Sequence, residues 1–280
     1  MSKFTAVLKK DLLVNKKNLI IPYIIMAVFF LLMTTLILIQ VGKMDYEFDD
    51  IYISFDEPSE AASYIANIFM LILPGFLSII FTLLLAQSAL NEDMRQNCEL
   101  FHRSQPISIW KRTISKFMVA IVGNWLFLIV LGIVNLIITA IILTQFVPFH
   151  LGKALVGFAQ AFIGFAKFNL IIGSLAFFCS AIFKDKAFLK GLAILVGIHV
   201  FLVILEIFMN ISVPSPLSYF AKLLQDTSVN VNSSLNYNLQ AFILDRWQSL
   251  ILNSKVILQL AFCTLMYVVG TLIYKYREIK

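Results

Sequence analysis

With 280 residues, 60% of them hydrophobic and only 14% charged, the chain departs strongly from soluble domains, in which about 25% of residues are charged. This composition, with a mean hydropathy of +0.89, excludes a water-soluble fold and favours one membrane domain over residues 1–280, built from membrane spans. The net charge of +6 comes from basic residues that flank apolar runs. That arrangement fits orientation in a membrane and argues against a nucleic-acid-binding surface.

Residues 3–17 predict an amphipathic helix. Lysines occupy one arc of this helix, and the other arc is apolar: Phe4, Val7, Leu8, Leu12 and Val14. A helix that lies on anionic lipid explains the lysines. Asp11, however, falls inside the apolar arc. The second interpretation is therefore that this carboxylate contacts a partner protein or a basic residue of the next loop.

Six apolar segments are long enough to cross a bilayer, whose hydrocarbon core of about 30 Å requires about 20 helical residues. They extend over residues 19–41, 64–90, 117–143, 154–183, 189–211 and 256–274. The first follows five lysines and is longer than the apolar part of a signal peptide, so we expect it to be retained. The fourth exceeds the length of one span, and we expect its first third to lie along the outer surface.

Lysine and arginine are distributed very unequally between the two sides of these segments. Sixteen of the 22 lie in the N-terminal segment, the connections around residues 91–116 and 184–190, and the C-terminal end; five lie on the other side, and Lys167 lies within the fourth segment. Cytoplasmic connections retain positive charge. We therefore expect a multi-pass protein of the cell membrane with both termini in the cytoplasm.

Two longer connections are assigned to the outer side. Residues 42–63 carry seven acidic residues against one lysine, which predicts a solvated loop. Residues 212–255 contain two prolines and a stretch rich in asparagine and serine. After that stretch, apolar residues from Leu239 to Leu252 follow helical spacing. This pattern predicts a short interfacial helix with Trp247 at the depth of the lipid headgroups.

The inner connection over residues 91–116 is too long for a tight hairpin and predicts a short helix, a break and a second helix. Met94, Cys98 and Phe101 follow helical spacing. Pro106 disfavours a helical conformation at the residue before it, and Ser108 is suited to cap a helix that leads into the third span. Two roles remain open, a solvated loop and a docking surface for a cytoplasmic partner.

The stretch from Glu99 to Lys116 resembles the loop after the second span in type-two ATP-binding-cassette (ABC) transporter permeases. In that family an acidic residue, a leucine-rich turn, a proline followed by a small polar residue, and a lysine that opens span three recur in this order. The matching residues here are Glu99, Leu100, Pro106, Ser108 and Lys116. Lys10-Asp11 resembles the Lys-Glu pair of the family's N-terminal helix, and residues 180–184 resemble the end of its fourth span. One departure is Asn97-Cys98, where the family usually has Gly-Thr.

The resemblance implies an all-α membrane protein with six transmembrane helices, an N-terminal amphipathic helix and a cytoplasmic coupling helix between spans two and three. It also implies a separate ABC-type ATPase subunit with a groove for the coupling helix, and a second permease chain, identical or different. The function implied is ATP-driven transport, with export as the expected direction. The residues expected to dock on the ATPase are Arg95, Glu99, Phe101, Arg103, Pro106 and Trp110, with Asp11 as the contact of the N-terminal helix.

The nucleotide is expected on the partner and not on this chain. The sequence has no Gly-x-x-x-x-Gly-Lys-Ser/Thr phosphate loop. We therefore expect no catalytic activity, metal or cofactor in this chain, and ATP with magnesium in the ATPase subunit.

Three polar residues inside the predicted spans are candidates for a transport path, because a charge at the bilayer centre costs at least about 2.5 to 3.5 kcal/mol on insertion scales. Lys167 and Glu206 are expected at a similar depth near the outer surface, where they could pair across spans four and five. His199 lies near mid-span on the same helical face as Glu206. A purely structural role remains open for all three.

Two other classes of function compete with a permease. A membrane-embedded enzyme needs converging catalytic groups, but the three histidines are scattered over different connections and depths, and the three cysteines lack metal-ligand spacing. A self-sufficient secondary carrier is expected to have inverted repeats with broken spans in both halves. The sequence shows a single interruption of that kind, at Pro74-Gly75. It does not indicate the cargo.

Overall fold

The computed structural model describes residues 3–41, 58–91, 107–209, 215–225 and 238–276, and the regular elements in these ranges are helices. The long helices are α2 (Lys16–Val41), α3 (Pro58–Ser88), α6 (Ile109–Leu143), α7 (Leu151–Ile182), α8 (Ala187–Met209) and α11 (Ser254–Tyr276). The shorter ones are α1 (Lys3–Val14), α9 (Pro216–Gln225), α10 (Leu239–Trp247) and the π-helix η2 (Gln248–Leu252). The predicted all-α fold is confirmed.

The helices have the length and composition of an integral membrane protein. Within the described residues, five helical stretches are long and apolar enough to cross a bilayer, the last of them running from α10 through η2 into α11. A sixth is obtained when α1 and α2, whose axes differ by 51°, are counted as one bent span. The six apolar segments identified in the sequence coincide with α2, α3, α6, α7, α8 and α11. The predicted coupling helix falls in residues 92–106, outside the described residues.

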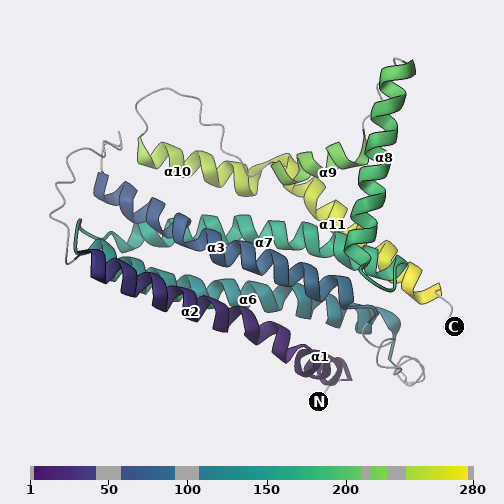
Figure 1. The fold of residues 1–280 in the computed structure, drawn as a ribbon, viewed down its shortest axis with the longest axis horizontal. Coiled ribbons are helices and arrows are strands. Elements are labelled where there is room, and N and C mark those ends of the chain that lie inside the picture. The colour runs from purple at the N-terminus through teal and green to yellow at the C-terminus, as the bar shows by residue number, and fades with distance from the viewer. Residues whose placement is uncertain (1–2, 42–57, 92–106, 210–214, 226–237, 277–280) are drawn as a thin grey trace.

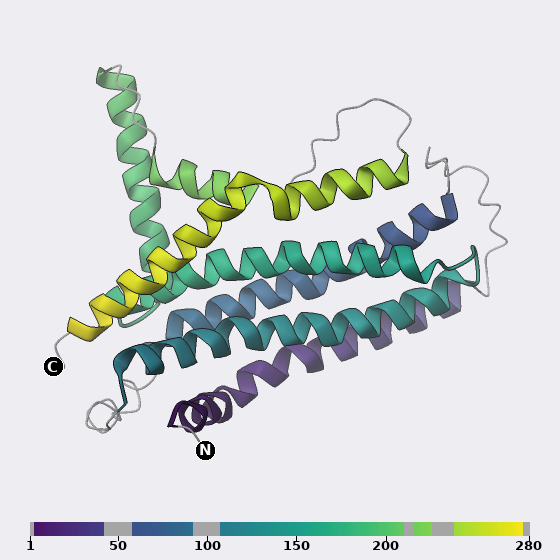
Figure 2. The same ribbon diagram turned by 180° about the vertical axis from the view of Figure 1, so that it is seen from behind.

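Four long helices, α2, α3, α6 and α7, lie side by side in both views of the ribbon (Figure 1, Figure 2). α3 and α7 run in the same direction and form the most extensive interface, and α6 runs antiparallel to both. α11 crosses the bundle obliquely. Both chain termini lie at the same end of the bundle (Figure 1), which we call the terminal end. The helices α3, α7 and α10 begin at the opposite end.

Small residues allow the helices to approach closely. A Cβ added at Gly157 of α7 would lie 2.5 Å from the backbone oxygen of Tyr64 in α3, and one at Gly132 of α6 would overlap the ring of Phe158. Lipid tails are as apolar as leucine, so helix association in a membrane depends on close packing and on interhelical hydrogen bonds. The glycines provide the close packing along α7.

Polar side chains provide the hydrogen bonds. A stripe of polar residues is buried in α3, α6 and α7, where these helices contact one another: Asn67, Ser78, Thr82, Asn124, Asn135, Thr139, Gln160 and Asn169. Asn169 donates to the hydroxyl of Ser78, and Asn135 donates to the backbone oxygen of Met70 over 3.1 Å. These bonds join α7 and α6 to α3.

Two features of the fold differ from the predictions. α7 is one unbroken helix, so its first third does not turn onto the membrane surface; instead it packs on α3 through Gly157. α10 and η2 cover the stretch Leu239–Leu252 in which a helix was predicted, but its interfacial position stays a prediction, because α10 continues through η2 into α11 as one span-length stretch. The helix α9 was not predicted. α8 leaves the bundle at a steep angle in both views (Figure 1, Figure 2) and has no buried residue in its most apolar window.

Candidate functional site at the terminal end

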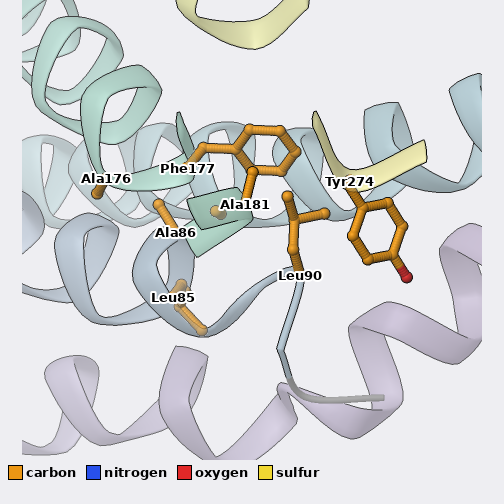
Figure 3. Packing of buried hydrophobic residues seen from close by; sticks show 8 residues of the cluster. Leu85, Ala86, Leu90, Ala176, Phe177, Ala181 and Tyr274 are labelled. Carbon is orange, nitrogen blue, oxygen red and sulfur yellow. The ribbon is translucent and has the colours of Figure 1, made fainter. Parts of the chain in front are cut away.

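Residues from four helices form a tightly packed cluster at the terminal end of the bundle. Figure 3 shows Leu85 and Ala86 of α3, Leu90 just after α3, Ala176 and Ala181 with Phe177 of α7, and Tyr274 of α11; Ala120 of α6 completes the cluster. Leu90, Ala176 and Phe177 have no exposed surface. Close-packed interiors transmit displacement because they contain little free volume. The ends of α3, α6, α7 and α11 are therefore packed against one another here with little free space.

The first end of the 92–106 segment is fixed to this cluster by two hydrogen bonds. The side-chain amide of Asn91 donates to the backbone oxygen of Phe183, at the end of α7, over 2.8 Å. The ammonium of Lys116 in α6 donates to the backbone oxygen of Ala89 over 2.8 Å. Asn91 and Lys116 are buried. The chain therefore enters the segment from a point that is bound to both α6 and α7.

The second end of the segment leads directly into α6. Ser108 caps this helix as predicted, and its hydroxyl accepts a hydrogen bond from the backbone N–H of Lys111 over 3.4 Å. One turn later the buried Thr113 lies 3.1 Å from the hydroxyl of Tyr267 and accepts a hydrogen bond from Thr271 over 3.3 Å. These contacts fix the start of α6 to α11.

The N-terminal helix is attached to the same place through Asp11. The hydroxyl of Ser115 in α6 donates to Oδ2 of Asp11 over 2.6 Å, and Asp11 is only 5% exposed. Lys10 and Lys116 line the small enclosed space, about 20 Å³, beside this carboxylate. A carboxylate removed from water requires hydrogen-bond donors and nearby positive charge, and this site provides both. The structure thus places Asp11 against the start of α6, within the chain itself.

Most of the residues predicted to dock on an ATPase lie outside the described residues: Arg95, Glu99, Phe101, Arg103 and Pro106. Trp110 is described. It lies in the first turn of α6, is 40% exposed, and has its ring 6.3 Å from that of Tyr267. The structure therefore brings Asp11 and Trp110 to the same end of the bundle, beside the two ends of the segment that contains the other five.

The intramembrane pair suggested for Lys167 and Glu206 is not formed. The ammonium of Lys167 donates to the backbone oxygen of Leu250 in η2 over 3.0 Å, whereas Glu206 is exposed on α8, which projects from the bundle. Position along each helix alone suggests an equal depth for the two residues, but α8 leaves the bundle at a steep angle and carries Glu206 away from α7.

His199 belongs to α8 and is half-buried against the start of α9. Its Nδ1 is 2.8 Å from the hydroxyl of Ser215, which itself caps the first turn of α9 by accepting from the N–H of Ser218. This contact gives the histidine a hydrogen-bonding partner within the fold. The structure does not bring His199, Lys167 and Glu206 together into one site.

The sequence did not reveal the polar stripe of α3, α6 and α7, although a signal for it exists. In α3, four polar residues are separated by four, eleven and four positions along an otherwise apolar run: Ser63, Asn67, Ser78 and Thr82. These separations place them near one helical face. Such a face in a membrane helix indicates interhelical packing. In the part of the chain that the structure describes, no three His, Cys, Asp or Glu side chains are grouped to hold a metal ion.

No protein-family model matches the chain, and no match was found among curated proteins. The likeness of residues 99–116 to ABC permeases therefore remains a prediction from those residues.

Proposed function

We propose that this protein is the membrane-spanning permease subunit of an ATP-driven ABC transporter, and that it works as an exporter. One observation carries the proposal: the 92–106 segment starts and ends at a junction where α1, α3, α6, α7 and α11 are joined by buried contacts. A force applied to this segment would reach five helices at once. A separate ATPase, docked on the segment, would supply that force through ATP hydrolysis.

Hydrogen bonds between helices make this junction suited to transmit a force. Lys116 joins α6 to the end of α3, Asn91 joins the same end to α7, and Asp11 joins α1 to α6. Packed helices have discrete arrangements and move as rigid bodies, so a small displacement at one end becomes a rotation or shift of whole helices. In the proposed cycle, binding of ATP to the partner displaces the segment, and the helices rearrange around the substrate path.

The charge distribution supports the proposed orientation. Lysines lie at the helix ends that meet at the terminal end: Lys16 at the start of α2, Lys111 in the first turn of α6, Lys184 just after α7 and Lys275 in the last turn of α11. Positive charge is retained in the cytoplasm. In the proposed arrangement the junction faces the cytoplasm, where an ATPase has access to ATP and magnesium.

The exposure of the helix α8 supports the proposal of a second permease chain. Its residues are exposed on nearly all sides within this chain, including Phe201, Ile207 and Phe208. A helix that is apolar all round is stable when lipid or another protein surrounds it. In the proposed assembly, two chains, identical or different, enclose the substrate path.

Cross-linking at the segment tests this function. A photoreactive amino acid at Phe101 should cross-link the chain, in intact membranes, to a protein that contains the Gly-x-x-x-x-Gly-Lys-Ser/Thr phosphate loop of an ATPase. The matched control is the same photoreactive residue at Phe146, which is exposed at the opposite end of the bundle. Cross-linking of an ATPase from Phe146 and not from Phe101 would contradict the proposal, as would the absence of any ATPase at both positions.

A further inference from the structure

A cavity of about 610 Å³ lies at the opposite end of the bundle, between the first turns of α3 and α7 and the helix α10. Its size falls within the range of about 300 to 1,000 Å³ that is typical of small-molecule sites. The contacts described at the terminal end do not involve the residues that line this cavity. Next to the cavity, Gln160 of α7 accepts a hydrogen bond from the hydroxyl of Tyr64 and donates to the backbone oxygen of Ile243 over 3.0 Å. These two hydrogen bonds hold together the three helices that form the walls of the cavity, α3, α7 and α10.

One wall of the cavity carries two opposite charges. The ammonium of Lys153 lies 2.7 Å from Oε2 of Glu60, and both side chains are only 23% exposed. Nδ1 of His150 lies 3.9 Å from Oε1 of the same carboxylate, and Nε2 of His150 lies 3.2 Å from the hydroxyl of Ser59. The charges are thus mostly withdrawn from water at the edge of a space that is large enough for a ligand.

The remaining lining is mainly apolar, and the cavity opens toward the outside of the bundle. Val156 and Ile243 line the interior, and Leu151 and Leu244 line the rim, where they are 57% and 62% exposed. Exposed leucines on a membrane helix contact acyl chains. A molecule in this cavity would therefore have its polar part at the ion pair and its apolar part continuous with the bilayer.

We propose that this cavity binds a phospholipid with a zwitterionic headgroup that carries a primary amine, as in phosphatidylethanolamine. The headgroup phosphate would pair with Lys153 and the headgroup ammonium with Glu60. A zwitterion supplies a partner to each charge and leaves the net charge of the site unchanged, whereas an anionic lipid supplies a partner to Lys153 alone and adds a net negative charge beside Glu60. This inference uses the membrane location of the chain and does not depend on the proposed ATPase partner.

Site-resolved cross-linking of defined lipids tests the proposal. The full-length protein, purified in detergent, is incubated with equal amounts of phosphatidylethanolamine or phosphatidylglycerol that carry the same photoreactive acyl chain. Mass spectrometry of the digested protein then locates the cross-links. We expect phosphatidylethanolamine to label residues 149–156 or 240–244 at least about fivefold more than phosphatidylglycerol. Equal labelling of this region by both lipids, or labelling confined to other helices, would overturn the proposal.

Charge variants separate lipid recognition from loss of structure. Glu60→Lys should reverse the preference toward phosphatidylglycerol, because the site then holds two cations, and Lys153→Glu should reduce labelling by both lipids. The double variant, Glu60→Lys with Lys153→Glu, restores one charge of each sign and should recover the preference for phosphatidylethanolamine. Recovery in the double variant shows that the single variants act through charge. An unchanged preference in Glu60→Lys would refute the assignment of the headgroup contacts.

Two further measurements distinguish a lipid from a soluble ligand. Leu244→Trp should fill the rim of the cavity and reduce labelling of residues 149–156 by phosphatidylethanolamine, and persistence of full labelling there would contradict an acyl chain at this position. Soluble phosphoethanolamine at millimolar concentration should compete weakly, because it lacks the acyl chains that contact the apolar walls. Complete competition by phosphoethanolamine would assign the cavity to a soluble ligand and overturn the lipid proposal.

Discussion

Asp11 is an acidic residue in a strongly basic helix, and its surroundings explain why it is accommodated there. Its carboxylate accepts a hydrogen bond from the hydroxyl of Ser115 over 2.6 Å, and the residue is almost entirely buried. The interaction converts a helix that could have rested on lipid into one that is attached to α6. The sequence indicated that the carboxylate required a partner, but it could not identify a serine on the third span, which lies more than 100 residues away.

Replacing Asp11 should loosen α1. Asp11→Ala leaves the buried hydroxyl of Ser115 without its acceptor, which costs about 1 to 3 kcal/mol, whereas Asp11→Asn retains an acceptor oxygen and should have a smaller effect. Limited trypsin digestion in detergent reports the detachment, since Lys9 and Lys10 lie on the same helix. We expect cleavage at these lysines to accelerate at least about fivefold in Asp11→Ala. Equal cleavage rates for Asp11→Ala and the unaltered protein would show that this contact does not attach the helix.

Two glycines of α7 provide a matched pair for testing the packing. A methyl group at Gly157 would meet the backbone oxygen of Tyr64 at 2.5 Å, whereas the space within 4 Å of a methyl group at Gly164 is empty. Gly157→Ala should therefore destabilise the protein by about 1 to 3 kcal/mol, and Gly164→Ala should be neutral or stabilise it by up to about 1 kcal/mol. The thermal unfolding midpoint in detergent measures both. A midpoint for Gly157→Ala at or above that of Gly164→Ala would contradict the close contact of α3 and α7.

At the scale of elements, the break between α10 and α11 is stabilised by a charged side chain inside the bundle. η2 ends at Leu252, and the ammonium of Lys167 donates to the backbone oxygen of Leu250. Irregular helix ends at membrane depth require partners for their backbone groups. Lys167 provides such a partner, and this gives the charge a structural role.

Removing this contact should increase the mobility of the break. Lys167→Met retains most of the side-chain volume but cannot donate to Leu250, so hydrogen exchange of the amides in residues 248–254 should accelerate at least about threefold, which corresponds to about 0.7 kcal/mol. Glu206→Gln is the matched control and should leave these amides unchanged, because Glu206 lies on α8. An equal acceleration in both variants would instead support an ion pair between Lys167 and Glu206.

The sequence predicted the elements well where their signals were local. Apolar length located the six long helices, and proline and serine at the end of the inner connection located the start of α6 at Ser108. Prediction from the sequence failed where the structure of a segment depends on its packing against other helices. The contact of Lys167 with η2 requires a backbone oxygen made available by the break, and α9 forms from a short polar-apolar pattern of residues 216–225 within a long connection. Neither follows from the composition of one helix.

At the scale of the whole molecule, the fold places both termini at one end, with most of the basic residues. The proposed orientation predicts that residues 42–63 face the exterior. In a variant with Cys98, Cys179 and Cys263 replaced by alanine, a single cysteine at Ser54 should react with a membrane-impermeant maleimide in intact cells, and one at Ser104 should react only after the membrane is permeabilised. The reverse pattern would show that the chain is inserted the other way.

The central claim is that the segment between α3 and α6 receives work from a separate ATPase. The most direct measurement is Mg-ATP hydrolysis in the material that co-purifies with the tagged chain in mild detergent, for the unaltered protein and for the double variant Glu99→Lys with Arg103→Glu. We expect ATP hydrolysis to co-purify with the unaltered chain and to fall at least about tenfold in the variant, at equal yield of the chain in the membrane. Hydrolysis that is absent from the unaltered preparation, or fully retained in the variant, would contradict it.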